Sequence, residues 1–128
     1  MRRLHKQQVS DMFIINCKNY DEIAGDKINK LAIIAEKISR KHKIQIALSP
    51  PHHQLASIKK SKLLIFAQHL DDAKVGSTTG YMIPELVKKS KVNGALINHS
   101  EHRISPKEIT NLVKRLKKLK MKTVVCVK

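Results

Sequence analysis

The chain has 128 residues, 41% of them apolar, which is enough for one domain with a buried core. Lysine and arginine number 26 against 10 acidic residues, so the formal net charge is +16 at pH 7. The sequence shows neither a membrane-spanning stretch nor the apolar run of a secretion signal, and two cysteines are too few for a secreted disulfide scaffold. We therefore expect a reduced, cytoplasmic protein with no membrane partner.

The positive charge is spread along segments with helical patterning, and its densest stretches lie at residues 59–62, 88–91 and 114–120. A charge this high attracts nucleic acid without any specific site. The few aromatic side chains that could stack on bases are Phe13, Tyr20, Phe66 and Tyr81. We interpret the lysines as solvated helix faces, with non-specific attraction to nucleic acid as the alternative.

Residues 1–11 form a basic segment without apolar periodicity, and we expect a disordered leader there. The first ordered pattern begins at Met12, which makes this methionine a candidate for the true start of translation. We expect residues 12–128 to form the folded part of the chain.

Short apolar runs alternate with helical patterns from Met12 onward. The runs predict five strands, at residues 13–15, 44–48, 63–67, 94–97 and 123–127. Helical spacing between the first two strands predicts a helix whose apolar face consists of Ile28, Leu31, Ala32, Ala35 and Ile38.

The later connections carry helix signals of their own. A short helix with Leu55 and Ile58 follows the second strand. After a long loop at 68–80, a helix opened by Pro84 has three apolar neighbours on one side, namely Ile83, Leu86 and Val87. The segment 105–108 reads Ser-Pro-Lys-Glu, a capping box that starts the next helix. That helix continues with an apolar stripe made of Ile109, Leu112, Val113, Leu116 and Leu119.

This alternation predicts an α/β fold with a parallel sheet, because strands that are apolar on both faces must be covered on both faces. Two architectures fit the pattern: a doubly wound open sheet, or part of an eight-stranded (β/α) barrel. Periodicity does not distinguish them. In both, functional groups gather at the C-terminal ends of the strands.

The end of the first strand carries Asn16 and Lys18, which strand alternation places on one side, with Cys17 on the other. A lysine at a strand end suits an anionic substrate, although a lysine that merely extends into solvent is the alternative. The orientation of Cys17 argues against nucleophilic catalysis by its thiol.

The end of the fourth strand carries His99, and residues 100–103 could begin a helical turn there. A histidine at a helix start meets the positive end of the helix dipole, which favours its neutral form. His99 and His102, with Glu101 between them, could instead bind a metal. Two histidines without a third evident ligand make a weak zinc site, so we expect neither a metal nor a cofactor.

Four segments resemble the triose-phosphate isomerase family, in order and in register from Met12 to Val127. FIINCKNY resembles its first strand with the Asn-x-Lys signature, and FAQHLDDAKVGSTTGYMIPE its third strand and subunit-interlocking loop. LINHSEHR resembles its fourth strand and histidine motif, in the archaeal form, and TVVCV its fifth strand. Cys17 departs from the larger apolar residue that is usual there. The resemblance implies the first four βα units and strand five of a (β/α) barrel.

By position, the resemblance implies catalytic roles for three residues. His99 would be the neutral electrophile that polarises the substrate carbonyl. Lys18 would bind the anionic triose phosphate and stabilise the enediolate, and Glu101 would orient the site and pair near Lys18. The reaction implied is the interconversion of glyceraldehyde 3-phosphate and dihydroxyacetone phosphate, in glycolysis and gluconeogenesis.

Five further residues take supporting roles by the same resemblance. Asn16 would help to hold the substrate, while Ser100, Arg103 and Gln68 would support the site. Thr79 would reach across the interface of a homo-oligomer.

The family's catalytic base is a glutamate after the sixth strand, and its phosphate is bound after strands seven and eight. The 128 residues contain none of these elements, so we expect a truncated chain that is inactive alone. Two alternatives remain: a half-barrel that completes itself by pairing with another half, and a basic binding protein on a degenerate isomerase scaffold.

Overall fold

The structure is a computed structural model that describes residues 11–59 and 61–127. Strands alternate with helices in the order β1 (Met12–Asn16), η1 (Asp21–Ile23), α1 (Lys27–His42), β2 (Gln45–Ser49), η2 (His52–Ser57), β3 (Leu64–Ala67), α2 (Pro84–Lys89), β4 (Gly94–Ile97), α3 (Pro106–Lys118) and β5 (Lys122–Val125). The proposed leader at 1–11 lies outside the described residues, except for Asp11.

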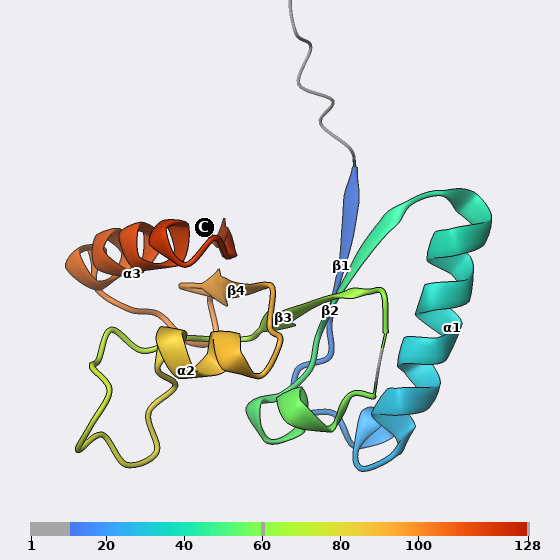
Figure 1. Cartoon of the computed structure of the whole chain (residues 1–128), viewed down its shortest axis with the longest axis horizontal. Helices are drawn as coiled ribbons and strands as arrows, with labels where there is room; N and C mark the ends of the chain where they lie inside the picture. Colours follow the sequence, from blue (N-terminus) through green and yellow to red (C-terminus); the bar gives the residue numbers. More distant parts are fainter. Residues whose placement is uncertain (1–10, 60, 128) are drawn as a thin grey trace, which may run out of the picture.

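The five strands form one sheet in the order β1-β2-β3-β4-β5, and every neighbouring pair is parallel. Figure 1 shows this sheet curling, with α1, α2 and α3 arranged around its outside. A doubly wound sheet reverses its strand order at a switch point, whereas this order follows the sequence throughout. The expectation of a barrel segment is therefore confirmed.

The sheet has apolar residues on both faces. The helix-facing cluster includes Ile46, Leu48, Ile65 and Ile97 among its buried members. The opposite, concave face holds a smaller cluster with three buried residues, namely Ala47, Phe66 and Leu96. Because neighbouring residues of a strand point to opposite faces, the alternation of Ile46, Ala47 and Leu48 follows from strand geometry. Strands covered in this way explain the continuous apolar runs in the sequence.

The ends of the long helices have clear local causes. The capping box of α3 is confirmed: the Ser105 hydroxyl accepts from the Glu108 amide at 3.2 Å, and the Glu108 carboxylate accepts from the Ser105 amide at 3.1 Å. Helix α1 ends at His42; the next residue, Lys43, has a left-handed φ of 52° and its amide donates to the Ser39 carbonyl. These contacts determine where α3 begins and where α1 ends.

Two residues expected on the apolar faces of helices are exposed, so the prediction is wrong for them. Ile38 of α1 is 44% exposed and Leu86 of α2 is 46% exposed. Helix α1 packs on the sheet through Ile28, Ala32 and Ala35, and at 100° per residue Ile38 lies roughly 90° away from that line. The fifth strand also begins one residue earlier than expected and ends at Val125.

The loop before α2 is attached to α3 by a charged network. The Arg115 guanidinium contacts Asp72 at 3.2 Å and pairs with Glu85, and Asn111 donates to Asp72 at 2.9 Å. The hydrogen bonds from Arg115 hold the pKa of the Glu85 carboxyl below its usual value, although burial opposes the shift. The network fixes one side of the loop.

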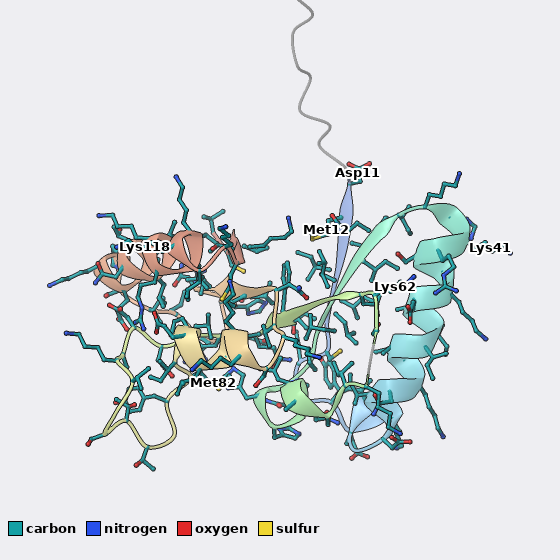
Figure 2. All side chains as sticks on the ribbon, in the orientation of Figure 1. Asp11, Met12, Lys41, Lys62, Met82 and Lys118 are labelled. Atoms are coloured by element: carbon teal, nitrogen blue, oxygen red, sulfur yellow. The ribbon has the colours of Figure 1, made fainter. Side chains whose placement is uncertain are left out.

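Both outer strands have a single partner among the described strands. Apolar side chains are exposed beside them: Phe13 is 58% exposed and Val127 is 83% exposed. Elsewhere the surface is basic, and Figure 2 labels Lys41 on α1 and Lys118 on α3 at opposite sides of the view. No helix in the described part of the chain is long and apolar enough to cross a membrane.

Candidate active site

A cavity of about 640 Å³ opens at the C-terminal ends of the strands. Its walls come from the loops after β1, β2, β3 and β4. They consist of Asn16, Lys18, Asn19, Tyr20, His52, His53, Gln68, His69, His99, Glu101 and His102. The structure therefore brings Asn16, Lys18, Gln68, His99 and Glu101 to one cavity.

The backbone at Lys18 is held by its neighbours. Its φ of 50° is left-handed, a conformation that costs free energy for a residue with a side chain. Its amide donates to the Asn16 side-chain oxygen at 3.0 Å. The Gln68 amide donates to the Lys18 carbonyl at 3.0 Å and to the Ser49 carbonyl at 3.2 Å. Contacts from the ends of β1 and β3 thus hold the Lys18 backbone, and Gln68 links it to the end of β2.

The Lys18 ammonium lies 3.2 Å from the Glu101 carboxylate. Both side chains are more than a third exposed, so the pair contributes little stability. Its effect is geometric, because it joins the loop after β1 to the loop after β4. It also leaves the lysine charge facing the cavity beside several histidines, an arrangement that suits an anionic ligand.

His99 begins a turn, as expected, but this turn is single and does not continue as a helix. The His102 amide donates to the His99 carbonyl at 2.7 Å, which closes the turn, and α3 begins only at Pro106. Because the turn does not continue as a helix, no helix dipole acts on His99. Instead, the Glu101 amide donates to His99 Nδ1 at 3.1 Å. An accepting Nδ1 has no hydrogen, so the neutral ring carries its hydrogen on Nε2.

The base of this turn is braced by Asn98, whose φ is 63°. Its side chain donates to the Cys126 carbonyl at 3.2 Å and accepts from the Ile104 amide at 3.0 Å. Arg103 donates to the Asn98 carbonyl at 3.1 Å. Ser100 is exposed, with no side-chain hydrogen bond found in the described residues.

Cys17 lies away from the cavity, packed into the helix-facing core and only 5% exposed. Burial raises the pKa of its thiol to about 11. A thiol in this state is a poor nucleophile at neutral pH. The metal alternative gains no support either, because residues 11–59 and 61–127 hold no group of three or more histidine, cysteine or acidic side chains placed to bind an ion.

Several cavity residues were not identified from the sequence. Asn19 and Tyr20 follow the Asn-x-Lys motif, and His52 and His53 follow the two prolines after β2. Their one signal was their position after a strand. Thr79 is exposed and lines a neighbouring cavity of about 390 Å³.

Comparison with known proteins agrees with this geometry. The family model described as triosephosphate isomerase matches residues 11–128. The chain is 54% identical over 119 residues to triosephosphate isomerase of Cenarchaeum symbiosum, covering 93% of the chain and 54% of that protein. It is 40% identical over 117 residues to that of Saccharolobus solfataricus, covering 91% and 52%.

The fold agrees as well. A crystal structure of triosephosphate isomerase from Bartonella henselae superimposes with a TM-score of 0.74 at 16% identity, covering 93% of this chain and 52% of that one. The chain spans about half the length of the relatives it matches. The chain belongs to the triosephosphate isomerase family.

Proposed function

We propose that Lys18, His99 and Glu101 form the charge-stabilising part of an isomerase site that interconverts glyceraldehyde 3-phosphate and dihydroxyacetone phosphate. The observation that supports this most directly is the meeting of Lys18, His99 and Glu101 at one cavity. Such a site acts on small phosphorylated sugars, as in glycolysis and gluconeogenesis. The substrate, the reaction and the roles below are all part of the proposal.

Lys18 supplies the positive charge. A triose phosphate is anionic, and its enediolate intermediate carries additional negative charge on oxygen. A fixed ammonium at the strand end stabilises that developing charge more than it stabilises the neutral carbonyl, which is the condition for catalysis. Asn16 and Gln68 assist by holding the lysine backbone, and Asn16 also contacts the substrate.

His99 supplies a hydrogen-bond donor. With Nδ1 occupied by the Glu101 amide, its Nε2–H is free to polarise the substrate carbonyl and to bond the enediolate oxygen. Glu101 holds both partners, through its amide to His99 and its carboxylate to Lys18. Arg103 supports the turn through the Asn98 carbonyl, whereas Ser100 has its supporting role only by the family resemblance.

Neither Lys18 nor His99 has the role of removing the carbon-bound proton. By family resemblance that base is a glutamate after the sixth strand, and we propose that it is supplied from outside these 128 residues. The 128-residue chain alone then binds and stabilises charge without catalysing. Thr79 would meet a second subunit in the complete oligomer.

The test is a chimera in which residues 11–128 replace the matching part of the Cenarchaeum symbiosum relative. We expect the chimera to isomerise glyceraldehyde 3-phosphate and the isolated chain to remain at background. Lys18→Ala or His99→Gln in the chimera should lower kcat/KM by at least about 100-fold, because each removes a transition-state contact. Lys27→Ala, at the start of α1, is the matched control. A chimera that folds but is inactive would disprove the proposal.

A self-associating half-barrel is the second candidate. The exposed apolar residues beside β1 and β5 favour it, because unpaired strand edges and apolar surface promote association. In that case the isolated chain would form a discrete oligomer, still without isomerase activity. The scattered lysines give no comparable support to a basic binding protein.

A further inference from the structure

Three histidines from three different loops meet beside the candidate active site. His69 follows β3, His102 lies in the turn after β4, and His52 begins η2. The rings of His69 and His102 are stacked, with centroids 3.5 Å apart and planes 12° apart. The ring of His52 lies 6.2 Å from that of His69. The three rings separate the 640 Å³ cavity from its 390 Å³ neighbour, since all three line both.

His69 is held firmly on its other side. Its side chain is 5% exposed, and its Nε2 lies 2.8 Å from the Asp71 carboxylate. Asp71 in turn accepts from the Met82 amide at 2.7 Å, and its own amide donates to the Met82 carbonyl at 2.9 Å. These bonds close the neck of the 71–82 loop. His69, Asp71 and Met82 therefore form a fixed platform, and the His102 ring stacks on it through His69.

His102 is exposed except for this stack, and its backbone belongs to the turn that carries His99. Its amide closes the turn on the His99 carbonyl, and the preceding amide, of Glu101, bonds the His99 ring. The His102 ring is therefore attached to the same short backbone segment that sets the positions of His99 and Glu101. The stack thus connects His69 to the turn that carries His99.

We propose that His102 is a positioning residue whose neutral ring, stacked on His69, holds the 99–102 turn so that His99 and Glu101 face Lys18, and that protonation of His102 releases the turn. We call this stack of His102 on His69, with the turn that it holds, the histidine latch. Its relevance to catalysis rests on the proposed function. The latch itself is a property of the fold and can be measured without catalysis.

The electrostatics agree with the geometry. Burial lowers the pKa of His102 below its ordinary value, and the nearby His69 lowers it further, while Asp71 opposes the shift. Burial and the neighbouring His69 lower the pKa of His52 in the same way. Burial alone would raise the pKa of Asp71, but hydrogen bonds from Met82 and His69 hold it below its ordinary value.

These lowered pKa values determine how stability depends on pH. A histidine whose pKa is lowered in the folded state stabilises the fold fully above its ordinary pKa of about 6.5. This stabilisation is lost as the pH falls below that value. The charged and titratable groups around His102 are Asp71 and His69 on the platform, His52 on η2, and His99, Glu101 and Arg103 on its own turn. Asp71 is one carboxylate facing three rings, so it cannot offset charge on all of them.

The test is a nuclear magnetic resonance titration of the full 128-residue chain between pH 8 and 5, following the Glu101 amide and the histidine rings. In the wild type, we expect the Glu101 amide shift to show an inflection at the midpoint of the His102 ring. The variant His102→Phe keeps a stacking ring without a titrating group, so this inflection should disappear. The control, His42→Asn at the end of α1, should keep it.

His102→Asn separates release of the turn from a mere field effect. It removes the stack while remaining neutral, so its Glu101 amide at pH 8 should already have moved toward the wild-type position at low pH. A wild-type chemical shift of the Glu101 amide in His102→Asn at pH 8, or the same inflection persisting in His102→Phe, would overturn the proposal. An isomerase chimera that is inactive at every pH, in a chain whose turn titrates as described, would disprove the proposed function and leave the latch standing.

Discussion

The Lys18 ammonium and the Glu101 carboxylate lie 3.2 Å apart although 83 positions separate them in the chain. The contact depends on curvature, because β1 and β4 are separated in the sheet by β2 and β3. A flat sheet with a spacing of about 4.8 Å per strand would place their ends about 14 Å apart. Long side chains and the curl of the sheet together bridge that distance.

The contribution of this pair to stability should be small. Glu101→Gln should change the free energy of unfolding by less than about 1 kcal/mol, because both side chains are more than a third exposed and solvent screens the pair. Urea denaturation followed by circular dichroism measures this. A loss of more than about 2 kcal/mol would show that the pair is energetically coupled to the rest of the turn.

Gln68 should matter more than its polar side chain suggests. Gln68→Ala removes the donor to both the Lys18 and Ser49 carbonyls, and leaves the left-handed Lys18 backbone without this support. We expect a loss of about 1–3 kcal/mol in the free energy of unfolding. Gln45→Ala, at the start of β2, is the matched control and should cost less. Equal effects in both variants would contradict the bracing role.

The elements that local pattern determines could be predicted from the sequence. The capping box at Ser105 needs only four consecutive residues, and the strands needed only apolar runs. The placement of Asn16, Lys18 and His99 followed from the rule that parallel strands present their C-terminal ends together. The stack of His69 on His102 could not be predicted, because it depends on the conformations of the loops after the paired strands β3 and β4, which no local pattern determines. The exposure of Ile38 was equally hidden, since the pattern shows which residues are apolar but not which neighbours cover them.

The two cysteines should differ in reactivity. Cys17 is buried with a pKa of about 11, so at pH 8 roughly 0.1% of it is thiolate. Cys126 is only partly buried. Iodoacetamide at pH 8 should therefore modify Cys126 at least about tenfold faster than Cys17, as read by peptide mass spectrometry. Comparable rates in the folded chain would contradict the burial of Cys17.

The concave face of the sheet should depend on Phe66. This ring is fully buried against Ala47 and Leu96, so Phe66→Ala should cost about 3–5 kcal/mol. Phe13→Ala is the control, because that ring is 58% exposed and should cost far less. Since small domains are stable by only about 5–15 kcal/mol, the Phe66 variant should be largely unfolded in moderate urea. A wild-type midpoint would show that the concave cluster contributes no stability.

The isolated chain should self-associate more strongly as ionic strength rises. Its outer strands each have one partner among the described strands, and Phe13 and Val127 are exposed beside them. At low salt the net charge of +16 opposes association by mutual repulsion, whereas at 0.1 M the screening length shortens to about 10 Å. Light scattering over a salt series, after removal of nucleic acid, should show a growing mean mass.

Two controls separate edge association from the other effects of salt. Phe13→Ser should reduce the mean mass at high salt, whereas Lys41→Ser, on the outer part of α1, should not reduce it. Nucleic acid bound through the lysines would show the opposite salt dependence, because its affinity falls as counterions compete. A wild-type chain that remains monomeric at high salt would mean that the strand edges are protected within the chain itself.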